Sequence, residues 1–122
     1  MVKKLFSDWD AGNLPTYKMP EVPVVETTEI DFIDMPNAVQ SEISLINTVN
    51  IKISDPDYFP VTLANQVFGG DFNSYLNMNL REKHGWTYGA RSSIGFDKYI
   101  YSKFKANAQV RNAVTDSSVV QS

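Results

Sequence analysis

Two glycine breaks between residues 65 and 88 constrain the fold more than any other feature of the sequence. The first break, Gly69 and Gly70, ends an apolar helical pattern, and glycine favours a helix end because it adopts positive φ at little cost. The second break, Gly85, follows a segment whose last turn is rich in cations, which interact favourably with the helix dipole. These breaks predict a helix, a glycine corner, a second helix and then a strand.

The second of these helices has a recognisable apolar face. Leu76 and Leu80 lie one helical turn apart, and we expect Tyr75 and Met78 to widen the face that they form. The two helices together are expected to occupy residues 57–84.

A pair of strands is expected before the helices. Residues 27–34 are rich in strand-forming side chains. Residues 40–49 alternate between apolar and polar side chains, which indicates a half-buried strand. Because only a turn at Pro36 and Asn37 separates them, we expect the two strands to pair with each other.

A second pair of strands is expected after the helices, at residues 86–96 and 99–110, with a turn near residues 95–98. The last strand alternates most cleanly, and its core face consists of Ile100, Ser102, Phe104, Ala106, Ala108 and Val110. The order of elements predicts an α+β fold: an antiparallel sheet of about four strands with two helices packed on one face.

The run from Phe68 to Tyr88 also carries a resemblance to a known family. It reads F-G-G-D-F-N-S-Y-L-N-M-N-L-R-E-K-H-G-W-T-Y. This resembles the signature of the non-zinc, C-terminal-type domain of the insulinase/pitrilysin-type zinc metallopeptidases, which include the mitochondrial-processing-peptidase-like proteins. That signature is a Gly-Gly corner, a helix that ends in Leu-Arg-Glu-Lys, and Gly-x-x-Tyr. A weaker likeness extends upstream through residues 36–41 to residues 5–9.

The chain divides into two expected parts. Residues 1–26 contain Pro15, Pro20 and Pro23, and we interpret them as an extended linker or leader. Residues 27–122 are expected to form the non-zinc α+β domain. A helix start at residue 115 is followed by too few residues to bury an apolar stripe. We therefore expect the domain to be truncated at its C-terminus, with uncovered apolar surface that favours self-association or segment exchange.

The residues present do not predict a catalytic or metal site within this chain. The resembled peptidases hold zinc on an inverted His-x-x-Glu-His motif and a distant Glu. This sequence has one histidine, His84, and no cysteine, so no cofactor is expected here. The resemblance implies zinc in the parent protein, held by another domain.

Arg81 and Tyr88 are the candidate substrate-binding residues. A helix–turn–strand reversal can bring a guanidinium and a phenol to one edge, where both can donate hydrogen bonds to a peptide carbonyl. From the residues alone, the alternative is favoured: Arg81 paired with a carboxylate and Tyr88 in the core. The resemblance reverses this preference, because in that family the matching Arg and Tyr contact substrate near the zinc of the opposite domain. Arg81 is expected to be largely exposed.

Two departures from the family pattern lie beside these residues. Asp71 stands where the corner often has a third glycine, and Trp86 stands where a smaller aliphatic residue is common. Both can alter the local cleft, but neither changes the Arg81–Tyr88 spacing. Gly69, Gly70 and Gly85 are expected to form the structural corner.

Three functions are compatible with this sequence. The first is the substrate-contacting half of a zinc peptidase, with peptide and the zinc-bearing domain, in the same chain or in a partner subunit, as its partners. The second is a non-catalytic partner subunit or assembly scaffold of the same fold, and the third is an unrelated α+β binding module. A net charge of -3 gives no electrostatic reason to bind nucleic acid or an anionic membrane. The compartment stays undecided, with a bacterial cytoplasm or periplasm as candidates.

Overall fold

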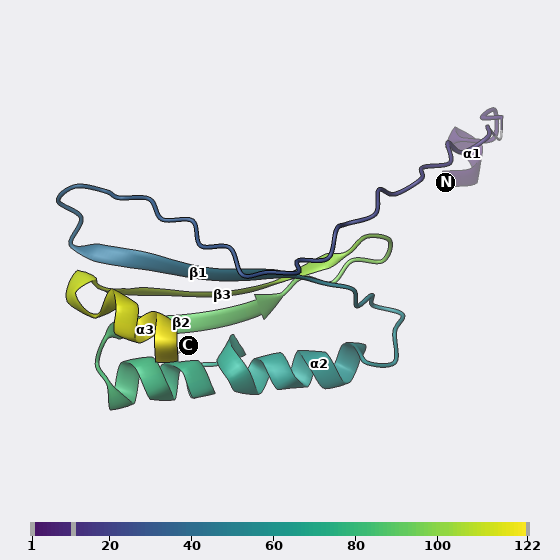
Figure 1. Cartoon of the computed structure of the whole chain (residues 1–122). Coiled ribbons are helices and arrows are strands. Elements are labelled where there is room, and N and C mark those ends of the chain that lie inside the picture. Colours follow the sequence, from purple (N-terminus) through teal and green to yellow (C-terminus); the bar gives the residue numbers. More distant parts are fainter. Residues whose placement is uncertain (1, 11, 122) are drawn as a thin grey trace.

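The computed structural model describes residues 2–10 and 12–121; Met1, Ala11 and Ser122, which belong to the predicted leader and to the end of the predicted domain, lie outside them. The described chain forms a three-stranded antiparallel sheet, and the helices that follow its first strand lie on one face, whereas the N-terminal helix lies apart from it (Figure 1). In order, the elements are α1 (Val2–Leu5), β1 (Gln40–Val49), α2 (Tyr58–Asn65), η1 (Gln66–Gly70), η2 (Asn77–Lys83), β2 (Thr87–Ile94), β3 (Ser102–Arg111), η3 (Asn112–Val114) and α3 (Thr115–Gln121). The predicted α+β class is confirmed, with three strands.

The sheet has the order β1-β3-β2, so the last strand in sequence is the central one. β1 pairs with β3 along its whole length, from Gln40 opposite Arg111 to Val49 opposite Ser102. β2 pairs with the other side of β3. The predicted alternation of β3 is confirmed, because Ser102, Ala106, Ala108 and Val110 are buried on its inner face. Its opposite face is largely polar and faces solvent.

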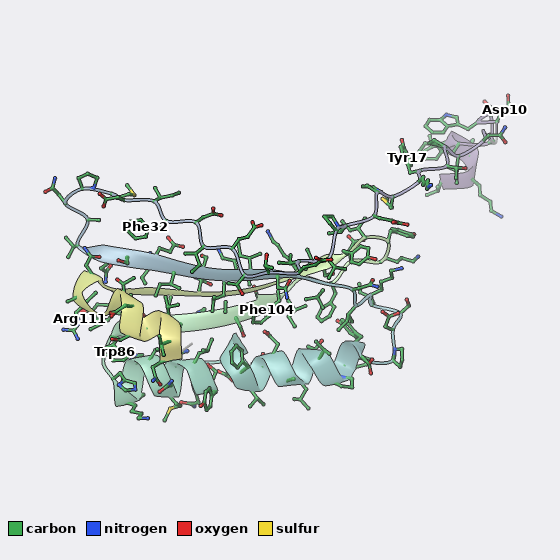
Figure 2. All side chains as sticks on the ribbon, in the orientation of Figure 1. Asp10, Tyr17, Phe32, Trp86, Phe104 and Arg111 are labelled. Carbon is green, nitrogen blue, oxygen red and sulfur yellow. The ribbon has the colours of Figure 1, made fainter. Side chains whose placement is uncertain are left out.

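The prediction of a strand at residues 27–34 is wrong. This segment has no ladder partner; it runs along the β1 side of the sheet without pairing (Figure 1). Phe32 is 83% exposed and lies on this segment, outside the sheet (Figure 2). Strand-forming side chains stabilise a strand mainly through cross-strand neighbours and a buried face. β1 finds its cross-strand neighbours in β3 and not in the segment that precedes it. The expected turn at Pro36 is confirmed, since Asn37 has φ 66°.

The core lies between the helices and the sheet. Its buried apolar residues are Leu76, Leu80, Ala90, Ala106, Ala108 and Val110. The helices contribute the two predicted leucines, and the sheet contributes small side chains that let the helices approach closely. None of the helices in the described part of the chain is long and apolar enough to cross a membrane.

Tyr75 and Met78 do not widen the core face as expected. They are 65% and 50% exposed, and Asn77 is buried instead. A helical period explains this: Leu76, Asn77 and Leu80 lie on one side of a helix, whereas Tyr75 and Met78 lie on the opposite side. The end of this segment, η2, is a π-helix.

The predicted turn between β2 and β3 is confirmed, and Asp97 organises it. Its Oδ1 accepts the N–H groups of Tyr99 at 2.7 Å and Ile100 at 3.2 Å. These two hydrogen bonds, the one from Tyr99 first, lower the pKa of the Asp97 carboxyl below its ordinary value. β3 begins at Ser102 and not at residue 99, because this loop uses the intervening residues.

We expect the Asp97→Asn variant to lose less stability in acid than the wild type. A depressed carboxyl pKa contributes stability that is present above the unfolded-state pKa and is lost as the pH falls through the folded-state pKa. The amide of asparagine can accept the same two hydrogen bonds at every pH. Thermal melting between about pH 6 and about pH 2 measures the difference. Asp57→Asn is the control, because the Asp57 side chain makes no capping hydrogen bond; equal acid sensitivity of both variants would contradict the expectation.

Candidate functional site

The corner between the two helices is set by a close approach at Gly69. A Cβ atom on Gly69 would lie 2.5 Å from Ser92 Oγ, 2.6 Å from Ser92 N and 2.8 Å from Leu76 Cδ1. Gly69 and Gly70 do not have positive φ; among the glycines described, only Gly85 does. The corner residues were predicted, but the physical reason for Gly69 is contact with β2 and not a left-handed helix cap.

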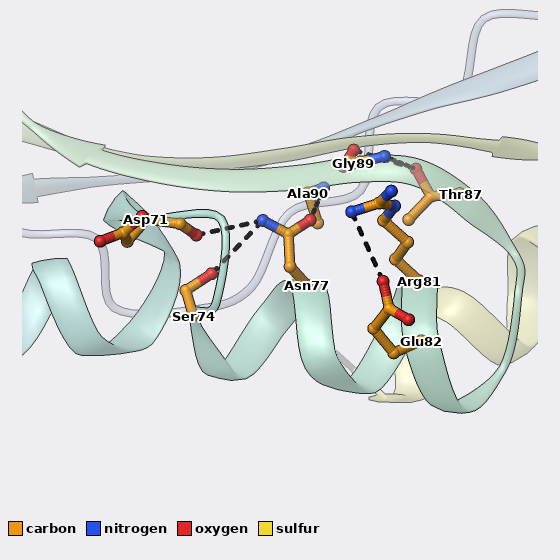
Figure 3. Close-up of polar contacts among 8 residues, drawn as sticks. All are labelled: Asp71, Ser74, Asn77, Arg81, Glu82, Thr87, Gly89 and Ala90. Carbon is orange, nitrogen blue, oxygen red and sulfur yellow. Dashed lines mark hydrogen bonds and ion pairs between the residues drawn. The ribbon is translucent and has the colours of Figure 1, made fainter.

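Asn77 connects this corner to β2 (Figure 3). Its Nδ2 donates to the carbonyl oxygen of Asp71 at 3.2 Å and lies 3.5 Å from Ser74 Oγ. Its Oδ1 accepts the N–H of Ala90 at 2.9 Å. The side chain is therefore a bridge between the loop that starts η2 and the strand that follows it.

Gly85 ends η2 as predicted. It has φ 62°, a left-handed conformation that costs glycine little. Its N–H donates to the carbonyl of Arg81 and the next N–H, of Trp86, donates to the carbonyl of Leu80, both at 2.9 Å. These bonds satisfy carbonyl groups of the last turn. The chain then reverses and enters β2 two residues later.

β2 begins with a β-bulge. Thr87 is opposite Val110 and Ala90 is opposite Ala108, so Tyr88 and Gly89 together face one residue of β3. Bulges of this kind re-aim side chains and are frequent beside active sites. The Thr87 hydroxyl accepts the N–H of Gly89 at 3.1 Å.

The Tyr88 side chain projects from this bulge and is 91% exposed. The alternative in which Tyr88 belongs to the core is therefore wrong. With so little burial, its hydroxyl is open to an external hydrogen-bond partner, and its ring contributes little to the core.

Arg81 is less exposed than expected. Its side chain is 32% exposed, and its Cζ lies 4.3 Å from the centre of the Phe72 ring. Nη1 lies 3.4 Å from Glu82 Oε1, yet this buried nitrogen has no hydrogen-bond partner. We interpret the Glu82 contact as a loose ion pair, since Glu82 is half exposed and such pairs contribute little. One guanidinium nitrogen thus keeps an unused donor.

Arg81 and Tyr88 lie on either side of the Gly85 reversal, at the end of η2 and the start of β2. Among the described residues, no hydrogen bond or cation–π contact joins the two. The reversal places a cationic donor and a phenolic donor on neighbouring elements, with the Tyr88 side chain almost fully exposed and the Arg81 side chain one-third exposed.

His84 packs beside this site without forming a metal centre. Its ring stacks on Trp86 with centroids 4.1 Å apart and planes at 22°. Nε2 is buried and has no hydrogen-bond partner. Over residues 2–10 and 12–121, no group of three or more His, Cys, Asp and Glu side chains is placed to hold a metal ion.

A protein-family model described as the peptidase M16 inactive domain matches residues 1–121. The chain belongs to this family. The match extends the resemblance seen in the run from Phe68 to Tyr88 to nearly the whole sequence. The family model names the domain as inactive, and this sequence contains no inverted zinc motif.

A solved M16 inactive domain has the same fold. The crystal structure of a peptidase M16 inactive domain from Pseudomonas fluorescens is 32% identical in sequence, with a TM-score of 0.63 over 69% of this chain. The match covers 20% of that chain, so the present chain spans about a fifth of its length. The comparison with curated proteins gives no match.

Sequence reasoning missed three residues of this M16 site: Phe72, Asn77 and Thr87. Asn77 had a signal, since an amide between two core leucines needs buried hydrogen-bond partners. The sequence signal for Phe72 was weaker: it is an aromatic residue in a polar corner, where no apolar core is expected to bury it. Thr87 had none, because its role depends on a bulge that only the pairing with β3 defines.

Proposed function

We propose that this M16 domain contacts the peptide substrate of a zinc-dependent metalloendopeptidase. The zinc is held by another domain, in the same chain or in a partner subunit, and the two halves enclose the peptide in a chamber. The present domain performs no hydrolysis alone. In this role, Arg81 and Tyr88 hold the peptide and donate hydrogen bonds to the carbonyl that the zinc polarises.

The observation that supports this proposal most is the exposure of Tyr88 on a fixed bulge. A tyrosine kept for stability is normally buried with its hydroxyl bonded, whereas this ring is 91% exposed. The bulge fixes the backbone from which the side chain projects, and an exposed phenol is a donor that can stabilise a developing oxyanion.

Arg81 supports the same proposal through the exposed part of its guanidinium. The Phe72 ring restricts the guanidinium. Nη1 is buried, but the side chain as a whole is 32% exposed, so a substrate carbonyl or carboxylate can approach its open part, and charge-assisted hydrogen bonds of this kind are stronger than neutral ones.

The second candidate function is a non-catalytic partner subunit or assembly scaffold. It is favoured by three apolar side chains that follow each other at intervals of four residues along α2 and η1. These are Phe59, Leu63 and Val67, which are 76%, 67% and 66% exposed. Such a stripe fits packing against another helix. It is compatible with substrate contact elsewhere on the domain.

Photocrosslinking tests the substrate contact. In the assembled zinc peptidase, stripped of zinc so that the peptide survives, Tyr88→p-benzoylphenylalanine is expected to crosslink a labelled unstructured peptide. The same change at Tyr99, which is exposed in the loop before β3, is the matched control and should not crosslink. Excess unlabelled peptide should abolish the adduct at position 88. Absence of that adduct, or equal labelling at both positions, would contradict the proposal.

A further inference from the structure

Two buried polar side chains flank the bulge that carries Tyr88. Asn77 is 4% exposed and Thr87 is 8% exposed. Asn77 approaches the strand from η2 and bonds the N–H of Ala90. Thr87 acts within the strand and bonds the N–H of Gly89. The two N–H groups that directly follow Tyr88 are therefore both accepted by side chains.

The Thr87 hydroxyl also fixes the other side of the bulge. Its Oγ1 donates to the carbonyl oxygen of Gln109 at 2.6 Å, with the carbonyl of Gly89 at 2.9 Å as the alternative acceptor. Gln109 is the β3 residue that the two bulged residues share. A methyl group in place of this hydroxyl would leave the Gly89 N–H without its acceptor.

Asn77 uses both ends of its amide, which few side chains could replace. Oδ1 accepts from Ala90 while Nδ2 donates to the carbonyl of Asp71. An aspartate would keep the acceptor and lose the donor, and a leucine would lose both. A leucine would also extend the apolar face of Leu76 and Leu80, so packing alone does not call for an amide here.

We infer that Asn77, together with Thr87, is a positioning residue that fixes the bulge and so the direction in which Tyr88 leaves β2. Asn77 touches neither substrate nor the reacting atoms in this assignment; it acts through Tyr88. Its effect on turnover rests on the proposed substrate contact of Tyr88, whereas its effect on the bulge does not.

Amide hydrogen exchange on the full 122-residue chain tests the effect on the bulge. The Asn77→Leu variant should exchange the Ala90 amide hydrogen about tenfold faster, as expected for the loss of one hydrogen bond. Asn79→Leu is the matched control: Asn79 is on the same helix, but its side chain donates to the carbonyl of Gln121. It should leave the Ala90 rate unchanged.

Thr87 gives a second route to the same result if Asn77→Leu does not fold. The Thr87→Val variant should speed exchange at Gly89, and Thr87→Ser, which keeps the hydroxyl, should restore the wild-type rate. An unchanged Ala90 rate in folded Asn77→Leu, or an unchanged Gly89 rate in Thr87→Val, would overturn the inference.

A double-mutant cycle in the assembled peptidase tests the link to Tyr88. Asn77→Leu should lower kcat with little change in KM, and this loss should nearly vanish in the Tyr88→Phe background. A merely structural role would lower turnover equally in both backgrounds, and that result would overturn the inference. If Tyr88→Phe keeps full turnover, the proposed function fails, and the exchange rates alone decide whether Asn77 positions the bulge.

Discussion

Replacing Gly69 with alanine is expected to destabilise the domain by about 3 kcal/mol, at the upper end of the range for overpacking. In an ordinary helical position the same change stabilises by up to about 1 kcal/mol. The sign reverses here because the new Cβ would lie 2.6 Å from the backbone nitrogen of Ser92. A flexible side chain could move away, but the backbone of β2 is held in the sheet. Urea denaturation measures the change in free energy of unfolding.

Gly95→Ala is the control for Gly69. A Cβ on Gly95 has no atom within 4 Å and its φ is not positive, so the variant should unfold within about 0.5 kcal/mol of the wild type. Equal destabilisation by both changes would contradict the expectation, because it would show that the contact with β2 is not what makes the Cβ atom costly. The contact sets how closely the helices approach β2, the strand that carries Tyr88.

Features encoded in neighbouring residues were predictable from the sequence. Gly85 and the bonds around it follow from the local demand for a left-handed residue at a helix end. The alternation along β3 is a period of two that burial on one face imposes. Leu76 and Leu80 were identified because two large apolar side chains one turn apart seek the same core.

Features that depend on distant partners were not predictable. The segment 27–34 has the composition of a strand, yet β1 pairs with β3, which is more than fifty residues away along the chain. Asn77 shares the helix face of Leu76 and Leu80, but its hydrogen bond from the Ala90 N–H depends on where β2 lies, which the sequence alone does not give. The packing demand at Gly69 comes from Ser92, on a strand that the sequence alone does not place beneath it.

The candidate site shows the same division. The pair Arg81 and Tyr88 was identified from its spacing around Gly85 and from the family resemblance. Three other features could be identified only once the pairing of β2 with β3 and the path of the corner were known. They are the bulge that carries Tyr88, the ring of Phe72 against the guanidinium, and the amide of Asn77.

The Tyr88→Phe variant is expected to lower kcat/KM of the assembled zinc peptidase about 100- to 1000-fold, as removal of one oxyanion donor does. The ring stays and only the hydroxyl is lost. An ordinary structural hydrogen bond is worth about 0.5–1.5 kcal/mol, and the Tyr88 side chain is 91% exposed, so the fold gains little from its hydroxyl. The melting temperature should therefore stay the same while turnover falls.

Tyr99→Phe is the matched control for this change. Tyr99 is also exposed, but it lies in the loop at the far end of β2. Removing its hydroxyl should change neither turnover nor melting temperature. A loss of rate in both variants would indicate a general effect on assembly.

The central claim, that this M16 domain lends a substrate contact to a zinc site held elsewhere, is tested most directly by kcat/KM for cleavage of an unstructured peptide. The wild-type and Tyr88→Phe domains are compared at equal amounts of assembled, zinc-loaded enzyme, with thermal melting of each variant alongside. The account predicts a rate loss of about 100-fold or more for Tyr88→Phe with unchanged melting. Full activity of Tyr88→Phe would contradict it and would leave the assembly scaffold as the function of the domain.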